Sequence, residues 1–273
     1  MTDRELFQKT VKSLPSLALP LAGTSLAVWL VWVLLMKGFS SVTYLETGDE
    51  LVLLLILLAA ALLTDFLHLG SARLCLDRGE GKPGAMPWTI LPQWRWYKGW
   101  ILWMGLFPIL WQAGKRLGRV WLAYRLTDLE FARFNMGMSV WNVVLSIGSL
   151  VLFPLLHLSV RTAYLRAPGR GFWRAVGFGL KEGFRKWPRT IGPQVKFVVP
   201  VTLGVRFLTA LFTKLILQVG GRTLFWGSFL AGGALSMVEN IWTWTLYGHL
   251  AAQRYDPPGG TEEKKKEEPE CFM

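Results

Sequence analysis

The residues best suited to acid–base or metal chemistry are the three histidines of this 273-residue chain, and each stands near the end of an apolar run. His68, His157 and His249 are each followed by leucine, with an arginine within the next five residues. Zinc ligands normally come at short, recognisable spacings and with neighbouring acids, so we expect neither a metal site nor a cofactor. The similar spacings of the histidines, 89 and 92 residues, instead suggest three related units.

Asp65 lies three residues before His68, which places the two side chains on one face of a helix. One interpretation is a proton relay in a lipid-modifying enzyme. The other is a carboxylate that lies near lipid headgroups or a loop arginine. The chain lacks the His-Glu-x-x-His, Gly-x-x-x-x-Gly-Lys-Ser/Thr and Gly-x-Ser-x-Gly motifs, so we predict that it is not an enzyme.

Arg206 stands in the middle of an apolar segment, where a charge costs about 2.5–3.5 kcal/mol and needs a partner or water. Glu239 is the candidate partner, because it lies about 18 residues beyond the Gly220-Gly221 turn and Arg206 lies about 14 before it, an offset of about 6 Å that the two long side chains could bridge. Glu239 also continues a face of small residues that favours close helix approach, made of Ser228, Gly232 and Ser236. We favour an internal ion pair that fixes helix register; a polar site for a substrate or proton is the alternative.

The composition indicates an all-α, polytopic membrane protein. Hydrophobic residues make up 52% of the chain, and the 23 residues from Leu14 to Met36 include no charge. A bilayer core of roughly 30 Å needs about 20 such residues as helix. We predict one transmembrane domain over residues 1–255 with six spans, at about 14–36, 51–72, 98–114, 135–158, 191–218 and 223–250.

The span at 98–114 is the weakest, because its charge-free run is only 16 residues long and contains Pro108. A re-entrant segment is the alternative there. Six full spans place 20 lysines and arginines on the cytoplasmic side and 8 on the outer side, in accord with the positive-inside rule. A re-entrant segment would move the base-rich loop 161–189 outside. We therefore predict six spans in the plasma (bacterial inner) membrane, with both termini cytoplasmic.

Basic stretches with interleaved aromatic residues predict helices that lie on the membrane surface. These are residues 5–14 and 172–187 on the inner side and 115–134 on the outer side. The six spans would form three hairpins, which could pack as a pseudo-threefold repeat; alternatively, His and Arg simply tolerate the interface. The charged cytoplasmic tail 256–273 is predicted to be disordered.

The net charge of +12 points to lipid and not to nucleic acid, because the bases stand in short loops beside apolar spans. There they face anionic lipid headgroups. We expect membrane lipids as partners, with an unidentified membrane protein as a further one. The two cysteines, Cys75 and Cys271, form no disulfide framework.

Two segments resemble known families. The stretch from Leu67-His68-Leu69-Gly70 to Asp77-Arg78-Gly79-Glu80-Gly81 is similar to a pattern in bacterial six-span proteins assigned to a domain of unknown function. The stretch 172–187 is similar to the basic segment before a late span in those proteins and in glycerophosphodiester phosphodiesterase membrane domains. The resemblance implies a six-span bacterial membrane protein, and it carries over no site residue and no activity.

Three functions from different classes remain open. The first is a non-enzymatic protein that binds or organises lipids or envelope partners, which suits the many interfacial aromatic residues. The second is a small transporter with a polar site at Arg206 and Glu239. The third is a lipid-modifying enzyme that uses Asp65 and His68. We favour the first.

Overall fold

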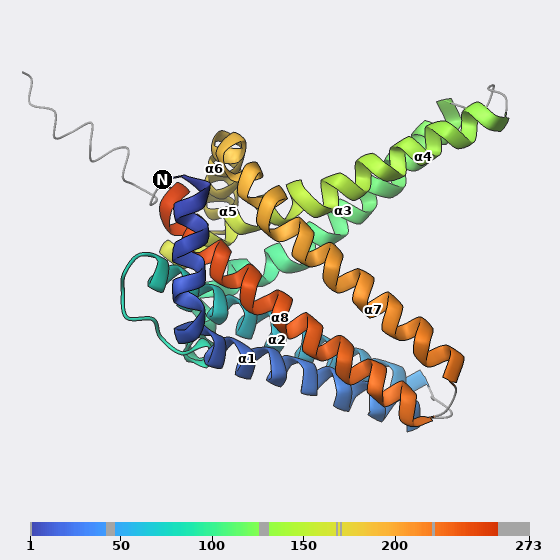
Figure 1. Cartoon of the computed structure of the whole chain (residues 1–273), viewed down its shortest axis with the longest axis horizontal. Helices are drawn as coiled ribbons and strands as arrows, with labels where there is room; N and C mark the ends of the chain where they lie inside the picture. Colours follow the sequence, from blue (N-terminus) through green and yellow to red (C-terminus); the bar gives the residue numbers. More distant parts are fainter. Residues whose placement is uncertain are drawn as a thin grey trace, which may run out of the picture. The chain divides into compact units, whose positions relative to one another are not determined.

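The computed structural model describes residues 2–41, 47–125, 131–167, 169, 171–219 and 222–255. The described part of the chain consists of helices with short connections and contains no strand (Figure 1). The prediction of an all-α fold is therefore confirmed. The predicted tail 256–273 and the Gly220-Gly221 turn lie outside the described residues.

The helices follow one another along the chain with few interruptions. They are α1 (Asp3–Ser41), α2 (Thr47–Gly79), the 3-10 segment η1 (Pro87–Tyr97), α3 (Lys98–Arg125), α4 (Phe131–Ile147), the π-helical turn η2 (Gly148–Leu152), α5 (Phe153–Arg166), α6 (Phe172–Pro193), the π-helical turn η3 (Gln194–Val198), α7 (Val199–Val219) and α8 (Arg222–Arg254).

Within the described residues, four helical segments are long and apolar enough to cross a membrane. They are Asp3–Leu35, Leu55–Gly79, Arg133–Arg166 and Phe172–Leu215. Their lengths exceed the roughly 20 residues that a bilayer core requires. The structure is thus compatible with a location in a membrane.

Two predicted boundaries are corrected. Residues 5–14 are not a separate surface helix but the first turns of α1, which changes direction partway along (Figure 1). Pro15 and Pro20 lie inside α1, and proline bends a helix because it removes a donor and crowds the preceding turn. Similarly, α3 continues unbroken through residues 98–125, so the start of the predicted outer helix 115–134 belongs to α3.

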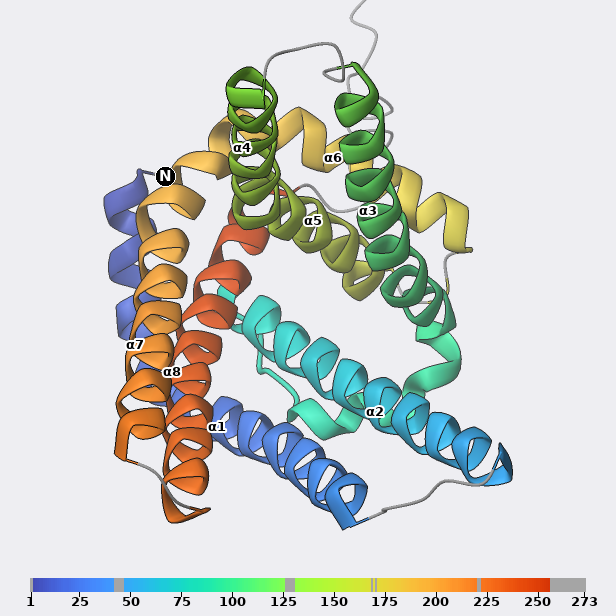
Figure 2. The ribbon, with the colours of Figure 1, turned by 90° about the vertical axis from the view of Figure 1, so that its right-hand side faces the viewer.

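The chain forms two compact units. The first comprises Met1–Arg95 and Val195–Tyr255, and the second contains Trp96–Gln194. In the first unit α8 packs against α1, α2 and α7 (Figure 2). Its core includes buried residues of α1 and α2, with two α8 residues packed on them: Leu17, Leu21, Leu74 and Cys75, with Ile241 and Trp244.

The close crossing of α2 and α8 depends on glycine. A Cβ atom at Gly248 would lie 2.5 Å from backbone and side-chain atoms of Cys75. We predict that Gly248→Ala lowers the free energy of unfolding by about 1–3 kcal/mol, because the two helices must move apart. Thermal unfolding of the purified protein in a mild detergent measures this effect.

The matched control is Gly204→Ala on α7, where a Cβ atom would meet nothing within 4 Å. Alanine favours a helix over glycine, so this variant should be unchanged or slightly more stable. Equal melting temperatures for the two variants would contradict the tight α2–α8 crossing.

Candidate functional site

The amphipathic helix α6 presents three chemically different faces, and it is the best candidate for a functional surface in the second unit. The predicted helix at 172–187 is confirmed and extends to Pro193. One face is buried and consists mainly of small residues, namely Ala175, Val176, Gly179, Glu182, Gly183, Thr190 and Pro193. The other two faces are exposed, one aromatic and one basic.

Glycines hold α6 tightly against α5. A Cβ atom at Gly179 would lie 2.5 Å from Val160 Cα, and one at Gly183 would lie 2.5 Å from Ser159 Oγ. With buried Ala175 these glycines form a small residue at every fourth position, the pattern that lets helices approach closely. This spacing is visible in the sequence itself, but it does not by itself show which helix packs against α6.

The one acid of α6 is neutralised inside the helix. Glu182 has a side chain only 7% exposed, and Arg185 Nη2 lies 2.6 Å from its Oε1 and 2.8 Å from its Oε2. A buried carboxylate needs such a partner, because burial of an unpaired charge is unfavourable. The surface of α6 therefore offers bases without a competing exposed acid.

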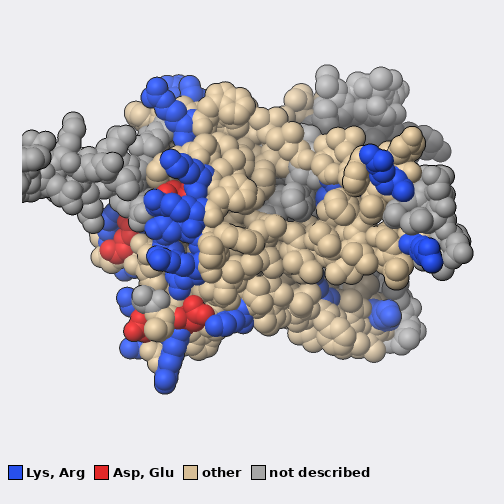
Figure 3. All heavy atoms as spheres, turned by 90° about the horizontal axis from the view of Figure 1, so that it is seen from above, with Lys and Arg blue, Asp and Glu red and all other residues tan. Residues whose placement is uncertain are grey.

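The exposed faces of α6 combine large aromatic rings with bases. Trp173 is 79% exposed, Phe184 62% and Trp187 41%, and the exposed Arg174 and Lys181 lie on the remaining side. Rings and bases at one level are typical of a membrane interface. Figure 3 shows Lys and Arg side chains on one face of the molecule, with surface without charge next to them.

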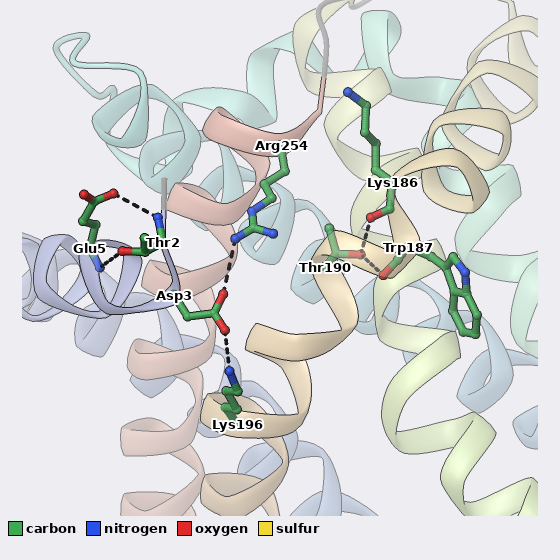
Figure 4. A network of polar contacts seen from close by, with 8 residues as sticks. All are labelled: Thr2, Asp3, Glu5, Lys186, Trp187, Thr190, Lys196 and Arg254. Atoms are coloured by element: carbon green, nitrogen blue, oxygen red, sulfur yellow. Dashed lines mark hydrogen bonds and ion pairs between the residues drawn. The ribbon is translucent and has the colours of Figure 1, made fainter.

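A second polar cluster ties helix ends together in the first unit (Figure 4). Asp3 of α1 contacts Lys196 Nζ at 2.7 Å and Arg254 Nη2 at 3.4 Å. Thr2 and Glu5 form a reciprocal cap, in which each backbone N–H donates to the other side chain, at 2.9 and 3.3 Å. These contacts fix the start of α1 against η3 and the end of α8.

The structure places both Asp65 and His68 on α2, where each is half-buried. The His68 ring lies against Trp244 of α8, with ring centroids 5.5 Å apart. Within the described residues no group of three His, Cys, Asp or Glu side chains could hold a metal ion. The catalytic interpretation of Asp65 and His68 stays a prediction.

Arg206 and Glu239 lie on adjacent antiparallel helices, and the structure, which describes both residues, records no ion pair between them. Trp242 Nε1 donates to Phe197 O at 2.8 Å, and Gly232 faces Thr209. These contacts place Arg206 of α7 beside about residue 235 of α8. Glu239 is one helical turn, ~6 Å, farther along the axis of α8. Arg206 is exposed, whereas Glu239 is half-buried.

The other two histidines contact different partners in different units. His249 is 5% exposed, and its Nε2 lies 2.8 Å from Ser13 Oγ in the first unit. In the second unit, His157 Nδ1 accepts a hydrogen bond from Trp103 Nε1 at 3.3 Å. Their shared sequence pattern therefore does not correspond to a shared set of contacts, and the repeat stays a prediction.

Comparisons of the chain with protein-family models, with curated proteins and with solved structures give no match. The proposed function accordingly follows from geometry and chemistry alone.

Proposed function

We propose that the chain is a non-enzymatic, multi-pass membrane protein that binds anionic phospholipid through α6. The observation that carries this proposal is the three-faced structure of α6. Its small residues pack on α5, its aromatic rings are exposed, and its exposed bases have no exposed acid on the same helix.

Each part of α6 suits a phospholipid bilayer. Exposed tryptophan rings favour the headgroup level, where an apolar body and a polar N–H are both accommodated. Each lysine or arginine near an anionic membrane surface contributes about 1 kcal/mol. A soluble acidic protein would also be attracted by Arg174 and Lys181, but it would leave the adjoining Trp173 and Phe184 unexplained.

We further propose six spans, arranged as three hairpins with both termini in the cytoplasm of a bacterial cell. Besides the four candidate segments, α3 and α8 are 28 and 33 residues long, which exceeds the length that a bilayer requires. The excess of bases on one side supports the orientation. Reporter fusions after Lys37 and after Arg254 test it: a cytoplasmic signal is expected only after Arg254.

We predict that the double variant Arg174→Gln, Lys181→Gln loses its selectivity for anionic lipid. Loss of two bases at about 1 kcal/mol each weakens binding about 30-fold. The measurement is native mass spectrometry of the protein released from vesicles of equal parts phosphatidylglycerol and phosphatidylcholine. We expect the unmodified protein to retain phosphatidylglycerol preferentially.

The matched control is Lys115→Gln, Arg116→Gln, which removes the same charge from the far half of α3. It should keep the preference for phosphatidylglycerol. An equal loss in both double variants would show that net charge, and not α6, attracts the lipid. Equal retention of both lipids by the unmodified protein would overturn the proposal.

A further inference from the structure

A groove between α3 and α6 in the second unit is lined entirely by apolar side chains. From α3 these are Trp103, Leu106, Phe107 and Leu110, and from α6 they are Phe172, Trp173, Val176 and Leu180. The α3 residues follow the spacing i, i+3, i+4, i+7, so they form one continuous stripe of that helix. The groove has a volume of about 410 Å³, which lies within the range of ligand sites in proteins.

The floor of the groove is fixed, whereas its rim is open. Trp103 and Val176 are 5% and 7% exposed at the floor, while Leu110 and Trp173 are 64% and 79% exposed at the rim. Trp103 stacks on Phe107 with ring centroids 4.2 Å apart and is hydrogen-bonded to His157 of α5. A preformed apolar groove of this kind can bind a flexible hydrocarbon chain without a change in the positions of its walls.

The charges near the groove indicate which kind of ligand it binds. Two exposed bases, Arg174 and Lys181, directly follow the groove residues Trp173 and Leu180 along α6, so they lie on the neighbouring side of the helix and outside the groove itself. The α3 wall has no Asp or Glu anywhere along its length, and the single acid of α6 is paired internally. A ligand that fits is apolar along its length and anionic at one end.

We infer that this groove is a binding site for one acyl chain of an anionic phospholipid, whose phosphate lies against Arg174 and Lys181. The inference rests on the proposed function, and it adds a single defined site to a general affinity of α6 for anionic lipid. Packing contacts with the apolar walls of the groove hold the acyl chain, and the neighbouring bases select the lipid headgroup. A site of this kind retains one lipid after detergent has removed the others.

The test uses a variant that fills the groove and leaves every charge in place. Leu106→Trp puts a bulky indole ring into the groove. Val120→Trp puts the same ring on α3 outside the groove, at a residue that is 67% exposed. The probe is dioleoyl phosphatidylglycerol, counted per protein by native mass spectrometry as detergent is increased. We expect one tightly held lipid in the unmodified protein and in Val120→Trp, and at least a tenfold weaker retention in Leu106→Trp.

The possible results separate this inference from the proposed function. If phosphatidylglycerol is enriched but Leu106→Trp retains it as well as Val120→Trp does, the groove site is wrong and the proposed function stands. If the unmodified protein shows no preference for phosphatidylglycerol, both fail. A groove that holds a second copy of the chain would instead show a dimer that Leu106→Trp dissociates, and this result would also overturn the inference. Circular dichroism and thermal unfolding of Leu106→Trp establish that the variant is folded.

Discussion

Replacement of Gly179 by leucine is expected to separate α6 from α5 and to abolish selective binding of anionic lipid. Even a single added carbon at Gly179 would lie 2.5 Å from Val160 Cα, a backbone atom that cannot turn aside. The rest of the leucine side chain has no space in a contact that already buries Ala175 and Gly183. We expect a loss of about 3 kcal/mol in the free energy of unfolding, at the upper end for overpacked sites.

Two measurements check the Gly179→Leu variant. Thermal unfolding in detergent reports its stability, and native mass spectrometry reports retained phosphatidylglycerol; we expect both to fall. The control is Gly177→Leu on the same helix, where a Cβ atom would meet nothing within 4 Å. It adds the same side chain and should retain both properties. A stable Gly179→Leu variant with undiminished lipid retention would contradict the close α5–α6 contact.

The second large effect is expected at Trp103, which forms the floor of the α3–α6 groove. Its side chain is 5% exposed, stacks on Phe107 and donates a hydrogen bond to His157 Nδ1. Truncation of a buried tryptophan to alanine typically destabilises a protein by about 3–5 kcal/mol, because packing is lost and a cavity remains. We therefore expect Trp103→Ala to lower the melting temperature more than any single substitution at the exposed rim.

Trp103→Phe separates the hydrogen bond from the packing. Phenylalanine keeps an aromatic ring against Phe107 but removes the hydrogen bond from Trp103 Nε1 to His157 Nδ1, which should cost about 0.5–1.5 kcal/mol. The exposed Trp121, at 60%, provides the control, since Trp121→Ala should change stability by less than about 0.5 kcal/mol. If Trp103→Ala and Trp121→Ala have the same melting temperature, Trp103 does not support the floor of the groove.

The sequence allowed the helices to be predicted but not all of their ends. Apolar runs longer than a bilayer and the periodicity at 172–187 depend only on local order, so they predict helices correctly. Near residues 14 and 115 a proline or a charge interrupts an apolar run, which predicts a helix boundary at each place. Charge and proline change the surroundings and direction of a helix without ending it, which explains why α1 and α3 continue through these positions.

Contacts between helices were harder to predict than the helices themselves. Counted from the turn, Arg206 and Glu239 are offset by about 6 Å along the helix axes. In the structure, the register of α7 and α8 is marked by Trp242 on Phe197 O and by Gly232 against Thr209. This register keeps the offset of about one turn that the sequence indicates. Only the structure, in which both residues are described, shows that Arg206 is exposed and that no ion pair joins it to Glu239.

The sequence by itself determined an all-helical protein, apolar enough for a membrane, and the division of α6 into aromatic and basic sides. These properties follow from composition and from a period of 3.6 residues, which one helix expresses without its neighbours. Only the tertiary structure decided that eight apolar residues from α3 and α6 line one groove and that Trp103 is its floor. The reason is that two helices together make a groove, and one of them, α6, is held in place by glycines that pack against α5.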